Sequence, residues 1–65
     1  MDKNKIAERL KKLRGNKSVE TVANELGITP QAVYQYEKGV RIPTDEMKIR
    51  IATFYKSSVE SIFYE

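Results

Sequence analysis

The predicted fold is decided by residues 18–39, which have the sequence SVETVANELGITPQAVYQYEKG. Ser18 can cap a first short helix, and Gly27 ends it because glycine readily adopts the left-handed conformation of a helix terminus. Thr29 can cap a second helix, where Pro30 at the first position loses no hydrogen bond that the helix needs. Gly39 ends this second helix. The stretch therefore predicts two short helices joined by a tight glycine turn.

Three positions in this stretch have the side chains that two steeply crossed helices require. Ala23 lies four residues before Gly27, and Val33 lies six residues after it. A small side chain is needed where the two backbones approach, and glycine where the chain reverses. An apolar anchor is needed where the second helix meets the core. Residues 18–39 therefore favour a crossed pair of helices over two helices in line.

A further helix is expected before this stretch. Apolar residues recur there at helical spacing, which predicts an amphipathic helix that Asp2 or Asn4 could cap. Gly15-Asn16 ends this helix. The apolar positions are Ile6, Leu10 and Leu13.

Two more helices are expected after residues 18–39. Pro43-Thr44 begins a fourth helix, whose buried face has Met47, Ile51, Ala52 and Tyr55. Ser57 or Ser58 can cap a short fifth helix from Val59 to Phe63, and Ser57 with Glu60 has the spacing of a capping box. No stretch alternates with a period of two. The chain is therefore predicted to be all-α, with five short helices.

The composition fits one domain over residues 1–65. A chain of this length buries only about 60% of the surface that its unfolded form exposes, which leaves little room for a deep substrate cavity. No apolar run approaches the roughly 20 residues of a membrane span. Without a targeting segment or a cysteine, the expected location is the reducing cytoplasm.

The charged residues favour an anionic partner and give no support for catalysis. Twelve lysines and arginines face nine acidic residues, for a net charge of +3. Nucleic acid and a membrane surface are both anionic partners that fit this excess of positive charge. A membrane surface is disfavoured because the apolar face of the first helix, which would have to bind it, is needed for the core. Histidine and cysteine are absent, and the acidic residues occupy caps and surface positions. We expect no catalytic residue, no metal and no cofactor.

Several phrases in a fixed order resemble the phage-repressor-like helix-turn-helix family of the Xre/Cro/CI type. Ala23, Gly27 and Val33 have the family's spacing, and the similarity extends over about residues 5–63. The other phrases are Leu13-Arg14, residues 22–28 (VANELGI), residues 36–39 (YEKG) followed by Pro43, Ile51-Ala52, and residues 59–63 (VESIF). The resemblance implies a compact lambda-repressor-like DNA-binding domain, with the motif at its second and third helices.

In that family the third helix lies in the major groove of DNA and its N-terminal residues contact base edges. The outward stripe of this helix lies opposite Val33 and Tyr36. Glutamine can bond to N6 and N7 of adenine, and Tyr and Pro can contact a thymine methyl group. The resemblance therefore predicts base contacts by Pro30, Gln31, Tyr34 and Gln35.

Phosphate contacts are expected around the recognition helix, from Ser18 and from Lys17, Lys38 and Arg41. One residue departs from the family pattern. Many members have glutamine at the position of Val19, where it contacts the DNA backbone, and valine cannot donate such a bond. Arg14 and Glu37 resemble the family's internal ion pair, for which we expect mainly a structural role.

The resemblance also implies a homodimer on a palindromic operator in double-stranded DNA. A dimer patch could include Ile49, Phe63 and Tyr64. We expect a transcriptional regulator that represses by occupying a promoter, with no membrane association and no small-molecule substrate. The alternative is a protein-interaction module, antitoxin-like or an anti-repressor, that keeps the same fold.

Overall fold

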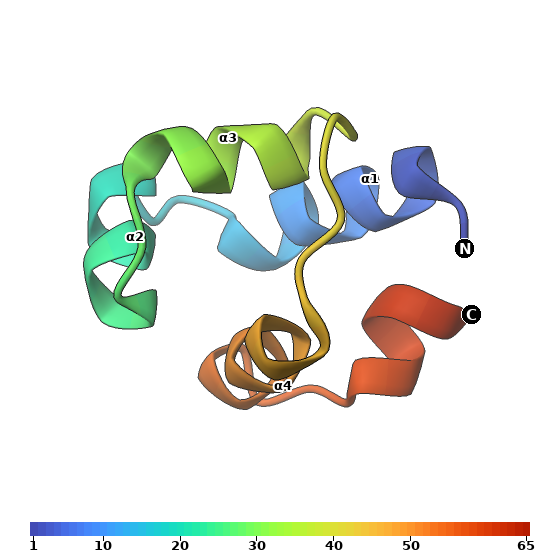
Figure 1. The fold of residues 1–65 in the computed structure, drawn as a ribbon. Coiled ribbons are helices and arrows are strands. Elements are labelled where there is room, and N and C mark those ends of the chain that lie inside the picture. Colours follow the sequence, from blue (N-terminus) through green and yellow to red (C-terminus); the bar gives the residue numbers. More distant parts are fainter.

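The computed structural model describes residues 1–65, and every regular element in it is helical (Figure 1). Four α-helices are followed by one π-helical turn. They are α1 (Lys3–Arg14), α2 (Val19–Leu26), α3 (Pro30–Glu37), α4 (Asp45–Phe54) and η1 (Glu60–Tyr64). This confirms the predicted all-α class with five helical segments.

Each α-helix begins at a side chain that caps it. The capping residues are Asp2, Ser18, Thr29 and Thr44. Thr29, for example, accepts a hydrogen bond from the backbone N–H of Ala32 at 3.2 Å. A cap of this kind contributes about 1 kcal/mol and fixes where the helix starts. Of the two candidate caps for α1, the structure uses Asp2.

The turn between α2 and α3 depends on Gly27, which has a φ of 72°. The N–H of Gly27 donates to Asn24 and the N–H of Ile28 donates to Ala23, at 3.3 and 3.0 Å. These two bonds form a Schellman motif, which requires the left-handed conformation at the glycine. The motif ends α2 sharply at Leu26, so that α3 starts at Pro30, three residues after Gly27, in a new direction.

The core lies where α1, α2, α3 and α4 meet, and η1 closes it from below (Figure 1). Ala23 is 1% exposed and Val33 is 4% exposed, as expected for the contact between the two motif helices. The buried cluster comprises Ile6, Leu10, Val19, Val22, Ala23, Leu26, Ala32, Val33, Tyr36, Ile51, Ala52, Ile62 and Phe63. α3 therefore rests on this core along one side and leaves its other side outward.

The fifth helical segment differs from the prediction in its capping box and in its π-helical form. The observed segment is a π-helical turn, Glu60–Tyr64, and the capping box between Ser57 and Glu60 is not formed. The N–H of Ser57 donates to Ala52 at 2.8 Å and so completes the end of α4. Of the two candidate caps, Ser58 accepts from the N–H of Ser61 at 3.1 Å.

The end of this turn is anchored from the opposite end of the chain. The guanidinium of Arg9 on α1 donates to the carbonyl of Ile62 at 2.9 Å and also to the carbonyl of Glu65. These bonds satisfy carbonyls at the end of η1, which places the two termini side by side (Figure 1).

Candidate nucleic-acid interface

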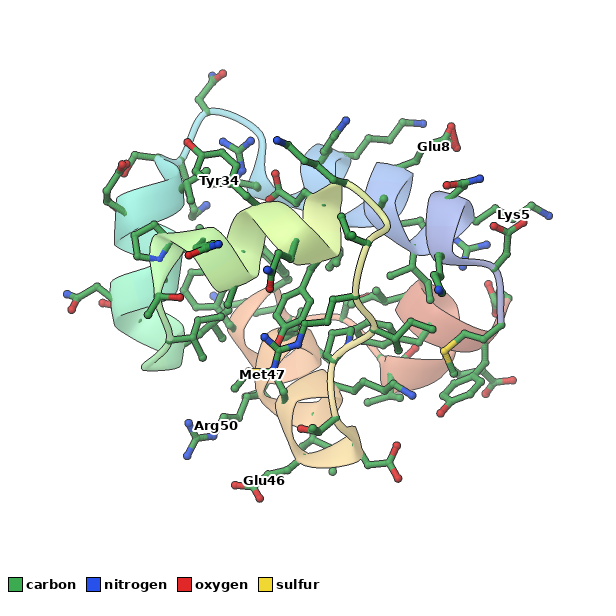
Figure 2. All side chains as sticks on the ribbon, turned by 45° about the horizontal axis from the view of Figure 1, so that its top comes forward. Lys5, Glu8, Tyr34, Glu46, Met47 and Arg50 are labelled. Atoms are coloured by element: carbon green, nitrogen blue, oxygen red, sulfur yellow. The ribbon has the colours of Figure 1, made fainter.

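The outward side of α3 has the residues predicted to contact bases. Pro30, Gln31 and Tyr34 are exposed, and Gln35 is half-buried. Tyr34 lies over α3 in Figure 2, whereas Glu46 and Arg50 extend from α4 at the opposite end of the view. The structure thus brings the predicted residues together on one open face.

This face is concave. Gln31, Tyr34, Gln35, Lys38 and Val40 line the hollow. Val40 is 65% exposed, and no sequence pattern singled it out because it lies beyond the end of α3. Two glutamine amides, a phenol ring and an ammonium group therefore converge with one apolar side chain, a combination that suits contact with the edges of bases.

An ion pair fixes α3 to α1. Arg14 Nε donates to Glu37 Oε2 at 2.8 Å, and Arg14 Nη2 donates to Glu37 Oε1 at 3.0 Å. Arg14 Nη1 also donates to the carbonyl of Lys17 at 3.0 Å. The hydrogen bond that Arg14 donates to Glu37, a residue that is 4% exposed, raises the pKa of Arg14. All three nitrogens of this guanidinium are engaged within the protein, so the pair acts in positioning α3 and the loop before α2.

Two of the three cations predicted to bind phosphate lie at the hollow. Lys38 lines it, with its ammonium 5.9 Å from the centroid of the Tyr34 ring, and Arg41 donates to Gln35. Lys17 is exposed in the loop before α2. The hydroxyl of Ser18 is occupied by its cap bond with the N–H of Thr21, at 3.0 Å. Ser18 can therefore offer a phosphate the backbone N–H groups of the helix start rather than its side chain.

Val19, the residue that departs from the family pattern, belongs to the core. Its side chain is 5% exposed and is part of the buried cluster. Valine at this position therefore adds buried apolar surface to α2, and its side chain has no hydrogen-bond donor for the DNA backbone.

Of the three residues predicted for a dimer patch, one is not on the surface. Phe63 is 1% exposed, so its assignment to a surface patch was wrong; its ring packs in the core. Ile49 is 59% exposed and lines a groove with Leu26 and Phe54. The hydroxyl of Tyr64 accepts a hydrogen bond from Lys48 at 2.9 Å, on the side of α4 that faces η1.

Three cations make long-range contacts that the sequence does not predict. Lys48 is only 5% exposed, and its hydrogen bond to Tyr64 raises its pKa. Arg50 donates to the carbonyl of Leu26 at 3.3 Å and so completes the end of α2. Arg9 holds η1 as described above. These partners are 16 to 53 residues apart in the sequence, and no local pattern links them.

α2 and α3 are two short crossed helices joined by a tight turn, the arrangement of a helix-turn-helix protein. The ion pair between Arg14 and Glu37 fixes α3, and an open polar face runs along this helix. The model of the helix-turn-helix family matches residues 6–62. The chain belongs to this family, of the Xre/Cro/CI type, and is a DNA-binding helix-turn-helix regulator. No curated protein and no solved structure matches it. None of its helices combines the length and apolar character needed to cross a membrane.

Proposed function

We propose that this chain is a sequence-specific transcriptional repressor that places α3 in the major groove of a double-stranded operator. The observation that carries the proposal is the open face of α3, where Gln31, Tyr34 and Gln35 converge in one hollow. In this proposal residues 1–65 act as one DNA-binding domain in the cytoplasm, and Pro30 and the three side chains of the hollow contact bases. Occupying the operator then blocks a promoter.

Three exposed cations support the binding of the DNA backbone. Lys38 and Arg41 lie at the hollow and Lys17 lies in the loop before α2, whose start at Ser18 can offer backbone N–H groups to a phosphate. Such contacts fix the protein on the duplex without selecting a sequence. They make the affinity fall as salt rises, with a log–log slope of about −4 to −8 for a dimer that neutralises several phosphates.

We propose that two copies bind a palindromic site. The groove at α4, where the apolar Ile49, Leu26 and Phe54 lie among polar side chains, is the surface that supports self-association. Tyr64 is 55% exposed and could extend the contact from the side of η1. Sedimentation of the free protein and of its DNA complex measures the stoichiometry, and one protein per operator would contradict this part of the proposal.

The test is selection of bound sites from a random pool of duplexes, followed by binding of the selected site at several salt concentrations. Gln31→Ala should weaken binding of the selected site by about 1–3 kcal/mol and relax its base preference at one position. Ser57→Ala, in the exposed link between α4 and η1, is the matched control and should change neither quantity. Equal losses on selected and random duplexes would contradict base contact by Gln31.

The alternative is a protein-interaction module with the same fold. Lys38 lines the outward face of α3 and Arg41 contacts Gln35 there, and these two cations favour DNA over a protein as the partner. Absence of any shift with random DNA at low salt and micromolar protein would favour the interaction module instead.

A further inference from the structure

Gln35, Arg41 and Tyr36 form a connected group at the C-terminal end of α3. Arg41 Nη1 donates to Gln35 Oε1 at 3.3 Å. The guanidinium carbon of Arg41 lies 5.7 Å from the centroid of the Tyr36 ring. Because Tyr36 is 5% exposed and part of the core, its ring is a fixed support for the guanidinium. Arg41 is therefore held in place by a buried group and in turn holds the amide of Gln35.

This contact determines which end of the amide faces outward. A guanidinium has donors and no acceptor, so only the oxygen of Gln35 can face Arg41. The oxygen and the nitrogen of an amide diverge from the same carbon. With Oε1 turned to Arg41, Nε2 and its two hydrogens are the end left for another partner.

We propose that Arg41 is a positioning residue for base contact by Gln35, and that Gln35 consequently selects a base edge that offers acceptors. The inference rests on the proposed function, since it assigns a preference to one residue of that interface. Guanine fits best because its N7 and O6 acceptors lie side by side in the major groove. Adenine fits less well because its N6 amino group is a donor and would meet the Gln35 Nε2 group, which is also a donor.

This role differs from that of a cation that only binds phosphate. A phosphate contact strengthens binding on every sequence and adds about one unit to the salt slope. A positioning contact instead changes which base the protein prefers at one base pair, and leaves binding of other sequences largely unchanged. Lysine at position 41 keeps the charge but loses the planar group that stacks on Tyr36 and forks toward the amide. Base preference and charge can therefore be separated by substitution.

The experiment uses the full chain in four forms, namely wild type, Gln35→Ala, Arg41→Ala and Arg41→Lys. Site selection with wild type and Gln35→Ala identifies the base pair whose preference depends on Gln35. Binding is then measured on duplexes that carry each of the four base pairs there, and on one with 7-deazaguanine, which lacks the N7 acceptor. Because Arg41 is exposed, thermal unfolding should be unchanged in its variants, which is checked by circular dichroism.

We expect wild type to prefer guanine over adenine at this position by about tenfold, and to lose most of that preference with 7-deazaguanine. Both Arg41 variants should reduce the preference to about twofold or less, although Arg41→Lys keeps the salt dependence of wild type. A preference that survives in Arg41→Ala, with equally weaker binding on all duplexes, would overturn the inference alone, as would a preference for adenine. Failure to select any site would overturn the proposed function and this inference with it.

Discussion

Replacing Glu37 with alanine removes the acceptor of the ion pair that joins α1 to α3. Both oxygens of Glu37 accept from Arg14, and the two side chains are 5% and 24% exposed, respectively. Breaking a fully buried pair costs about 3–5 kcal/mol, whereas an exposed pair contributes about 0–1 kcal/mol. Because about a quarter of Arg14 stays in contact with solvent, we expect Glu37→Ala to cost about 2–3 kcal/mol.

That loss is large for a chain of this size, whose total stability is about 3–10 kcal/mol. It corresponds to a fall in Tm of about 10–20 °C. Urea unfolding followed by far-ultraviolet circular dichroism measures the change in free energy. Glu8→Ala, on the exposed face of α1 (Figure 2), is the control and should stay within about 0.5 kcal/mol of wild type.

A double-mutant cycle separates the pair from other effects of the substitution. With Arg14→Met as the second change, the two side chains should show a coupling energy of about 1–2 kcal/mol. A cost below about 0.5 kcal/mol for Glu37→Ala, together with no coupling to Arg14, would refute the argument that this pair fixes α3.

Three further predictions concern single residues. Burial raises the pKa of Tyr55 from the ordinary value of 10.0 to about 12, so its contribution to stability is complete below pH 10 and is lost as the pH rises toward 12. In urea unfolding, Tyr55→Phe should reduce the fall in the free energy of unfolding between pH 10 and pH 12. The same fall in the variant as in wild type would contradict burial of Tyr55 as its cause. Gly39→Ala should cost about 1–2 kcal/mol, because φ is +72° and a Cβ would lie 3.2 Å from Asn4 Oδ1. A thermal unfolding curve identical to wild type would contradict this. Lys56 has a φ of 55°, so Lys56→Gly should raise the free energy of unfolding by about 0.5–1 kcal/mol, and a loss of stability would contradict the strain.

The four α-helices could be predicted from the sequence because their boundaries are set by local chemistry. Thr29 and Pro30 mark the start of α3 whatever surrounds them, and Gly27 adopts a conformation that few other residues tolerate. The outward stripe of α3 follows from helical geometry once Val33 is placed in the core. These parts of the fold and of the interface need no knowledge of distant contacts.

The end of the chain could not be predicted, because residues far away in the sequence determine it. η1 is anchored by Arg9, 53 residues before Ile62, and the N–H of Ser57 is already used by α4. Phe63 follows a pattern that fits either a surface patch or a core, and only the packing places it inside. The contact between Arg41 and Gln35 likewise depends on the path of the chain after Gly39.

The central claim is that the outward face of α3 is the surface that contacts DNA. Titration of the isotopically labelled protein with its selected duplex, followed by nuclear magnetic resonance, tests this claim residue by residue. We predict the largest changes in the side-chain amides of Gln31 and Gln35, in the ring of Tyr34, and in the backbone N–H groups at the start of α2. Changes confined to α4 and η1, with α3 unaffected, would contradict the account.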